Sequence, residues 1–282
     1  MSPYTHKYLF ARINILDAID DDRSSFYMNT FSAQVYVEKR NFRYMIAGES
    51  QISVEGNQFI YGELVKYKRE LETDVVDEEE KKVVDGKLPY GLVAQSKFFI
   101  HIGSQIVAYH PISNRISNNQ FITHLSELIE LGYDKFFVQA KIEPIDEDVK
   151  IQEAIKVLKS VFEVSFDIHP TNPTNRPIYR DLDERLKRLR ATREKRTIYS
   201  ESEGFNQEEL MNDDAYKGIM LAVDGYGSAS VSGRKDDESR ITISTGESPV
   251  TKDVSDSDDP KAIIVQLLEV FMKIWRRKDS DE

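Results

Sequence analysis

The residues most able to do chemistry form a basic segment between Arg176 and Arg196. Nine cations and four anions give it a surplus of five positive charges, in a chain whose net charge is −11. Cationic side chains carried on one rigid element can neutralise the phosphates of a nucleic acid. We therefore predict a nucleic-acid or partner-protein interface made of Arg185, Lys187, Arg188, Arg190, Arg193 and Arg196.

A helix from about Ile178 to Arg196 is expected to position these cations. Leu182, Leu186 and Leu189 recur at helical spacing and predict its buried stripe, so that most of the cations face outward. A solvent-exposed helix with no ligand fits the segment as well. Oppositely charged residues four apart support this second interpretation, namely Asp181 with Arg185, Asp183 with Lys187 and Glu184 with Arg188.

Carboxylates suggest an alternative function, a metal-dependent nuclease. Its best candidates are Asp167, Asp181 and Glu184, and a Glu-x-Lys sequence occurs at Glu79 and Lys81 within an acidic run from 70 to 85. Charge runs are usually solvated surface, which favours a connector for the acidic run. The chain has no cysteine, and its five histidines show no metal-binding spacing. We therefore expect no metal and no cofactor, and we assign no catalytic residue.

Other short motifs indicate turns. Gly225-Tyr226-Gly227 resembles the start of a phosphate-binding loop, but the third glycine is missing and a hairpin follows where a helix would be needed. Gly56-Asn57 and Gly103-Ser104 suit hairpin turns, and the latter would pair residue 101 with residue 106. The sequence thus does not indicate a specific activity.

The last helix is expected to begin at Asp259-Pro260, with Asp as its cap and Pro in its first turn. Its apolar stripe is wide enough for two interpretations, ordinary core packing or an interface between copies of the chain. The interface interpretation predicts a homo-oligomer held together by Ile264, Leu268, Phe271 and Trp275.

The composition is that of a globular protein of 282 residues, with 40% hydrophobic residues. The absence of cysteine suits a reducing compartment. The N-terminus lacks a signal-peptide pattern, and no run approaches the roughly 18 apolar residues of a membrane span. We therefore expect a cytoplasmic protein without membrane contact.

The order of elements predicts an α+β protein. Residues 97–168 read as two strands, a helix, a strand, a helix and a strand, so we expect mixed or mainly antiparallel sheets with helices packed on one face and an apolar C-terminal helix. Three prolines between 170 and 177 form a rigid connection. This predicts two domains, residues 1–170 with α+β structure and 171–282 with helices and a hairpin.

Short motifs in the second half resemble an uncharacterised bacterial family associated with phage defence. They are Ile168-His169-Pro170-Thr171-Asn172-Pro173, then Ala222-Val223-Asp224-Gly225-Tyr226-Gly227, and Ser244-Thr245 with Pro249. In size and layout the chain is also similar, more loosely, to the Rex exclusion sensor of lambdoid phages, which binds DNA. The resemblance implies an antiviral defence role, with nucleic acid or a defence protein as partner, and supplies no catalytic residue.

Overall fold

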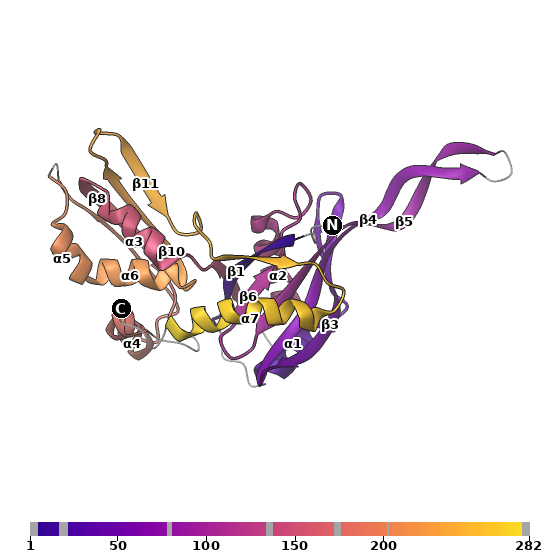
Figure 1. Ribbon diagram of the computed structural model, residues 1–282, viewed down its shortest axis with the longest axis horizontal. Coiled ribbons are helices and arrows are strands. Elements are labelled where there is room, and N and C mark those ends of the chain that lie inside the picture. The colour runs from indigo at the N-terminus through magenta and orange to yellow at the C-terminus, as the bar shows by residue number, and fades with distance from the viewer. Residues whose placement is uncertain are drawn as a thin grey trace.

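The computed structural model describes residues 5–16, 22–77, 81–133, 138–171, 176–201 and 203–277, with side chains other than those of 71–77 and 84–89. Two sheets with their surrounding helices lie side by side (Figure 1). All the strand pairings are antiparallel. The predicted α+β class with antiparallel sheets is therefore confirmed.

The first sheet has the order β12-β1-β6-β5-β4-β3-β2, and β7 also pairs with β1. Its strands are β1 (Thr5–Ile15), β2 (Val37–Lys39), β3 (Phe42–Val54), β4 (Asn57–Asp77), β5 (Lys82–His101), β6 (Ile106–Tyr109), β7 (Ala140–Pro144) and β12 (Thr251–Ser255). The helices α1 (Arg23–Phe31) and α2 (Asn118–Gly132) share a core with one face. The helix α7 (Pro260–Arg276) packs on the opposite face.

Two hairpin turns of the first sheet can be compared with the turns predicted from the sequence. The β5–β6 hairpin pairs His101 with Ile106, as predicted. In the β3–β4 hairpin the turn residues are Glu55 and Gly56, both with positive φ, and Asn57 already belongs to β4. The turn predicted at Gly56-Asn57 is thus displaced by one residue, because the pairing of Val54 with Asn57 leaves only residues 55 and 56 between the strands.

A two-stranded ribbon extends β4 and β5 beyond the rest of the sheet (Figure 1). Strand β3 pairs with β4 as far as Tyr67. From Lys68 to Asp77, the described part of β4 pairs only with β5. At about 3.3 Å per residue, the ribbon is about 33 Å long. Part of the acidic run predicted as a connector belongs to this ribbon. Glu79 of the Glu-x-Lys sequence lies outside the described residues.

The second sheet has the order β11-β10-β8-β9. Its strands are β8 (Ser160–Ile168), β9 (Glu194–Tyr199), β10 (Gly227–Arg234) and β11 (Arg240–Ser244). Helices gather over one of its faces, namely α3 (Asp148–Lys156), the 3-10 turn η1 (Pro177–Tyr179), α4 (Arg180–Arg188), α5 (Gln207–Asn212) and α6 (Asp214–Val223). Gly218 lets α6 approach closely, since a Cβ there would lie 2.8 Å from the ring of Phe166.

The two sheets divide the chain differently from the proline-rich segment. Strand β8 belongs to the second sheet, whereas β12 and α7 return to the first sheet and its core. A boundary between residues 170 and 171 would separate β8 from its neighbour β9. The prolines instead connect β8 to η1 inside the second unit, and residues 172–175 lie outside the described part of the chain. Among the described residues, no helix combines the length and apolarity that a membrane span requires.

Candidate functional site

The predicted basic helix ends eight residues earlier than its sequence pattern suggested. Helix α4 stops at Arg188, and β9 begins at Glu194. The N–H of Arg190 donates to the carbonyl of Lys187, and the N–H of Ala191 donates to that of Leu186, both over 3.0 Å. With Arg190 at φ 54°, these bonds form a Schellman motif that reverses the chain.

The prediction of a helix to Arg196 is therefore wrong, and so is the predicted burial of Leu189. That side chain is 71% exposed, while Leu182 and Leu186 are buried as expected. Helical spacing alone cannot show that a residue lies past the end of the helix, because the Schellman turn at Arg190 lacks its usual glycine. Arg190 and Arg193 consequently lie in the turn, and Arg196 lies on β9.

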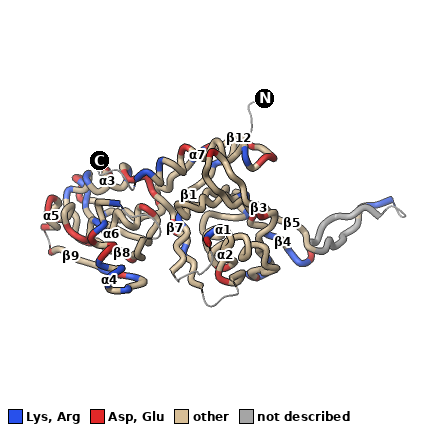
Figure 2. Tube along the Cα trace, turned by 90° about the horizontal axis from the view of Figure 1, so that it is seen from below, with Lys and Arg blue, Asp and Glu red and all other residues tan. Residues whose placement is uncertain are grey.

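The six predicted binding residues have two different electrostatic settings. Three are engaged inside the chain: Arg185 with Glu194 at 2.9 Å, Lys187 with Asp183 at 2.7 Å, and Arg193 with both carboxylate oxygens of Asp167. The other three are exposed and form no ion pair within the described residues, namely Arg188, Arg190 and Arg196. Figure 2 shows the blue segments around α4 at one end of the molecule.

The predicted oligomer interface on α7 is part of this chain's own core. Ile264 and Phe271 are fully buried, and Leu268 is 7% exposed. The ring of Phe271 packs against Phe10 at 5.2 Å between centroids. Trp275 lies 4.6 Å from the ring of His101. Ile264, Leu268 and Phe271 are therefore not available to a second copy, because the outer face of the first sheet already covers them. Trp275 is partly buried.

The candidate carboxylates of a metal-dependent nuclease are held by separate partners. Arg193 binds Asp167, Lys217 binds Asp181, and Glu184 is exposed on α4. Nowhere in the described ranges do three or more histidine or carboxylate side chains come together in a way that could hold a metal ion. The three predicted residues therefore do not form one site there.

The face of the second sheet opposite the helices is lined by hydroxyl groups. Strands β8 and β10 alternate apolar residues toward the helices with small polar residues toward the other side, as in Ala229, Ser230 and Val231. Cross-strand pairs place Ser165 beside Thr197 and Ser232 beside Thr242, each pair of side-chain oxygens 2.9 Å apart. We call this surface the hydroxyl face; its members are Ser165, Thr197, Ser228, Ser230, Ser232, Thr242 and Ser244.

Charged and aromatic side chains border the hydroxyl face. Lys195 pairs in register with Asp167, and Tyr199 pairs with Glu163, so both project on the same side as Thr197. Tyr199 is 72% exposed. At the other edge the guanidinium of Arg240 lies 5.6 Å from the ring centroid of Phe162. The face thus combines hydrogen-bonding hydroxyls with cations, with the carboxylates of Glu163 and Asp167 and with an exposed aromatic ring.

A cleft of about 250 Å³ opens where the hydroxyl face meets the first sheet. Strand β7 contributes Lys141 and Glu143, and the end of β8 contributes Asp167 and His169. We call it the junction cleft; its lining also includes Leu16, Gln139, Thr192, Arg193 and Ser228. Asp167 and Ser228 line both this cleft and the hollow on the hydroxyl face, so the two surfaces are continuous.

Burial acts in opposite directions on the pKa values of Glu143 and His169, two titratable groups of the cleft. It raises the pKa of Glu143, an effect that Lys141 opposes and Asp167 reinforces. Burial lowers the pKa of His169, whereas the hydrogen bond to Thr192 and the negative charge of Asp167 act to raise it. The Nδ1 of His169 lies 2.9 Å from the carbonyl oxygen of Thr192, which accepts only from a protonated Nδ1. The neutral ring therefore carries its lone pair on Nε2.

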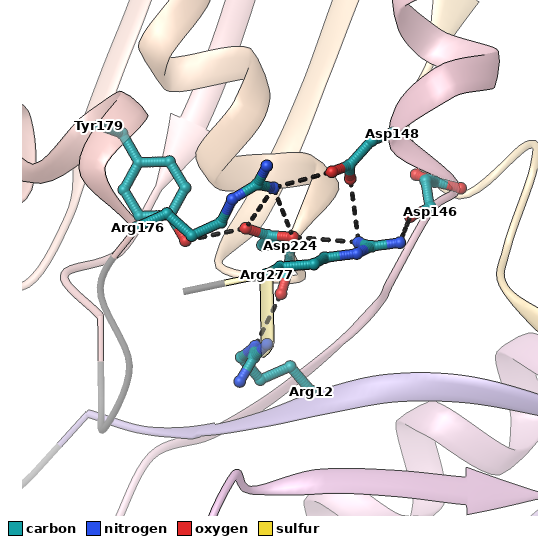
Figure 3. Close-up of polar contacts among 7 residues, drawn as sticks. All are labelled: Arg12, Asp146, Asp148, Arg176, Tyr179, Asp224 and Arg277. Carbon is teal, nitrogen blue, oxygen red and sulfur yellow. Dashed lines mark hydrogen bonds and ion pairs between the residues drawn. The ribbon is translucent and has the colours of Figure 1, made fainter. Parts of the chain in front are cut away.

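A buried ionic cluster joins the two units (Figure 3). Asp224, at the end of α6, is 2% exposed. Its carboxylate lies 3.1 Å from guanidinium nitrogens of both Arg176 and Arg277, and it accepts a 2.8 Å hydrogen bond from Tyr179. Asp148 binds the same two guanidiniums, at 2.9 and 3.0 Å. We call these residues the Asp224 junction.

The first sheet reaches the Asp224 junction through β1. The Nε of Arg12 donates to the backbone carbonyl of Asp224 over 2.7 Å, and Asn14 donates to that of Gly225 over the same distance. Burial by itself would raise the pKa of Asp224, but the charges of Arg176, Arg277 and Arg12 outweigh it and hold that pKa below its usual value. The carboxylate therefore stays ionised between the units.

One part of this junction has a signal in the sequence. Gly225-Tyr226-Gly227 is a turn, as predicted, and Gly225 has φ 81°. A Cβ at Gly225 would lie 2.8 Å from Cβ of Arg12, and one at Gly227 would lie 2.1 Å from the carbonyl oxygen of Asp167. Both glycines thus mark a close approach of backbones. The partners of Asp224 come from distant positions and carry no local pattern.

Comparison with known proteins adds a family and no activity. No curated protein matches the chain. The profile of one family, described as a domain of unknown function (DUF4747), matches residues 7–272. That description says nothing of phage defence or of the Rex sensor, so both stay predictions. Because the match spans both sheets and nearly all of α7, this chain belongs to the DUF4747 family.

Proposed function

We propose that this protein binds single-stranded nucleic acid across the hydroxyl face and the adjoining cations of α4 and β9. One observation carries the proposal: an uncovered, hydroxyl-lined sheet face bears Lys195 and the exposed ring of Tyr199 on its edge strand β9. The segment that leads into β9 adds Arg188 and Arg190, which are exposed and have no ion pair in the described part of the chain. Arg196 alternates with Lys195 and Thr197 and therefore projects from the other side of β9. Serine and threonine hydroxyls, arginine and lysine are the usual donors to phosphate and sugar oxygens.

The shape of this surface favours a single strand over a duplex. Unpaired bases can lie flat on a sheet and stack on exposed aromatic rings, which every base tolerates. Tyr199 supplies such a ring, and Lys195 supplies a charge four residues away on the same face of the strand. The net charge of −11 disfavours nucleic acid elsewhere on the molecule and confines binding to this region.

Fluorescence polarisation with labelled single-stranded RNA and DNA at two salt concentrations tests the proposal. The variant Arg188→Glu/Arg190→Glu/Lys195→Glu should weaken binding at least about tenfold and make it less dependent on salt, because each lost phosphate contact removes about 0.7 from the salt slope. Tyr199→Ala should weaken binding further, by about 1 kcal/mol or more, through lost stacking.

The matched control reverses three exposed cations on the first unit, Lys261→Glu/Lys273→Glu/Arg276→Glu. It changes the net charge by the same amount on α7. Equal losses of affinity in the two triple variants would show a general charge effect and contradict the proposed face. So would the absence of binding by the unmodified protein at low salt.

A further inference from the structure

We propose that the junction cleft cleaves RNA by attack of the ribose 2′-hydroxyl on the adjacent phosphate, with His169 as the base and Glu143 as the acid. The inference rests on the proposed function, since the continuous hydroxyl face would deliver the strand to this cleft. It goes further by naming RNA as the substrate and phosphoryl transfer as the reaction.

The cleft contains the groups that this reaction requires. His169 donates through Nδ1 to Thr192, which fixes the ring and leaves the Nε2 lone pair as a proton acceptor. Glu143 lies on β7, on the other side of the interface between the units, with Lys141 two residues before it on the same face of the strand. A base and an acid on separate elements can act on the two sides of one phosphate.

The proposed step conserves atoms and charge. Nε2 of His169 takes the proton of the 2′-hydroxyl, the 2′-oxygen forms a bond to phosphorus, and the bond from phosphorus to the 5′-oxygen breaks. The carboxylic acid of Glu143 gives its proton to that leaving oxygen. The products are a 2′,3′-cyclic phosphate and a 5′-hydroxyl, and water is not consumed. Lys141 would stabilise the negative charge on the non-bridging phosphate oxygens.

The surroundings favour these protonation states. Burial lowers the pKa of His169 and so keeps the ring neutral, and it raises the pKa of Glu143 and so favours its acid form. Asp167 is occupied by Arg193 through two nitrogens. It is therefore held as a structural anion beside the reacting pair.

Incubation of the unmodified 282-residue chain with a labelled single-stranded RNA, in the presence of a chelator, tests the inference. We expect RNA to be cleaved to products with a cyclic phosphate end, detected by mass spectrometry. The same sequence as DNA, or as RNA with 2′-O-methyl groups, should bind and stay intact. This arm uses the unmodified protein and does not depend on the folding of a variant.

His169→Asn and Glu143→Gln should each lower the cleavage rate at least about 100-fold while the affinity measured by polarisation changes less than about twofold. His110→Asn is the matched control, because the Nδ1 of His110 similarly lies 2.9 Å from a backbone carbonyl oxygen, that of Lys7, outside the cleft. RNA that binds but stays intact, or cleavage that persists in both cleft variants, would overturn the inference alone. A failure of all nucleic acids to bind would overturn the proposed function as well.

Discussion

Two sets of arginines in this protein show how position decides the role of one residue type. At the Asp224 junction, Arg176 and Arg277 share one buried carboxylate. On the α4–β9 corner, Arg188 and Arg190 extend into solvent without a carboxylate partner among the described residues. The first set is held by ion pairs between the two units, and the second set is exposed and can bind a ligand.

The difference follows from the cost of desolvating a charge. A buried guanidinium must have an anion beside it, so each junction residue depends on the others. An exposed cation is hydrated and contributes little to folding. A change at the junction should therefore lower the stability of the whole molecule, whereas a change at the corner should alter binding alone.

The strongest test of this comparison is Asp224→Asn. The variant removes the anion that faces three guanidiniums, and we expect it to lower the free energy of unfolding by about 3–5 kcal/mol, measured by urea denaturation. Asp253→Asn, at an exposed position on β12, is the control and should stay within about 0.5 kcal/mol of the unmodified protein. A loss below about 1 kcal/mol in the first variant would show that Asp148 and hydration suffice to compensate these charges without Asp224.

An apolar counterpart of that test is Phe271→Ala. Truncating this fully buried ring should cost about 3–5 kcal/mol of unfolding free energy, because the surrounding sheet cannot fill the cavity. Val265→Ala, at a position 54% exposed on the other side of α7, should cost far less. If Phe271→Ala kept its stability but changed the molecular mass in light scattering, the predicted oligomer interface would be restored.

Titration of His101 extends the comparison to a buried group that must stay neutral. Burial lowers its pKa to about 4, below the value of about 6.5 in an unfolded chain. The unfolded state therefore binds a proton first, and stability that is present above pH 6.5 is lost as the pH falls toward 4. We expect about 2 kcal/mol of loss between pH 7.5 and pH 5. In His101→Gln this part of the pH dependence should disappear, as measured by urea denaturation at both pH values.

The smallest expected effect sharpens the comparison at the corner. Arg190→Gly should raise the unfolding free energy by about 0.5–1 kcal/mol, since φ 54° is strained for a residue with a side chain. Arg188→Gly, within the last turn of α4, should instead lower it by about 1 kcal/mol. If both variants bind nucleic acid more weakly while their stabilities change in opposite directions, binding and folding are separate at this corner. Equal affinity in all three proteins would contradict the proposed interface.

Local patterns predicted the elements of the fold well. The hairpin pairing of His101 with Ile106 and the start of α7 at Asp259-Pro260 are confirmed, because turn and cap chemistry lies within a few residues. The end of α4 was missed because its turn lacks such a local signal. Its turn uses Arg190 in a conformation that usually requires glycine, so the sequence contained no stop signal.

The sites were predicted less well, because they depend on pairings between distant parts of the chain. The hydroxyl face exists only once β8, β9 and β10 lie side by side, and nothing in the isolated strands indicates that Ser165 meets Thr197. The junction cleft likewise needs β7 beside the end of β8. Charge density was visible in the sequence, but it did not show that Arg193 would be neutralised by Asp167.

The return of β12 and α7 to the first sheet has a consequence for synthesis on the ribosome. The second unit is inserted between β7 and β12, so the outer face of the first sheet stays uncovered until the last residues of α7 emerge. Arg12 meets its partner 212 positions later in the chain, at Asp224. The N-terminal half must therefore wait, with apolar surface exposed, until α7 has been synthesised. A nascent chain truncated before residue 260 should recruit holdase chaperones, whereas a chain that includes α7 should not.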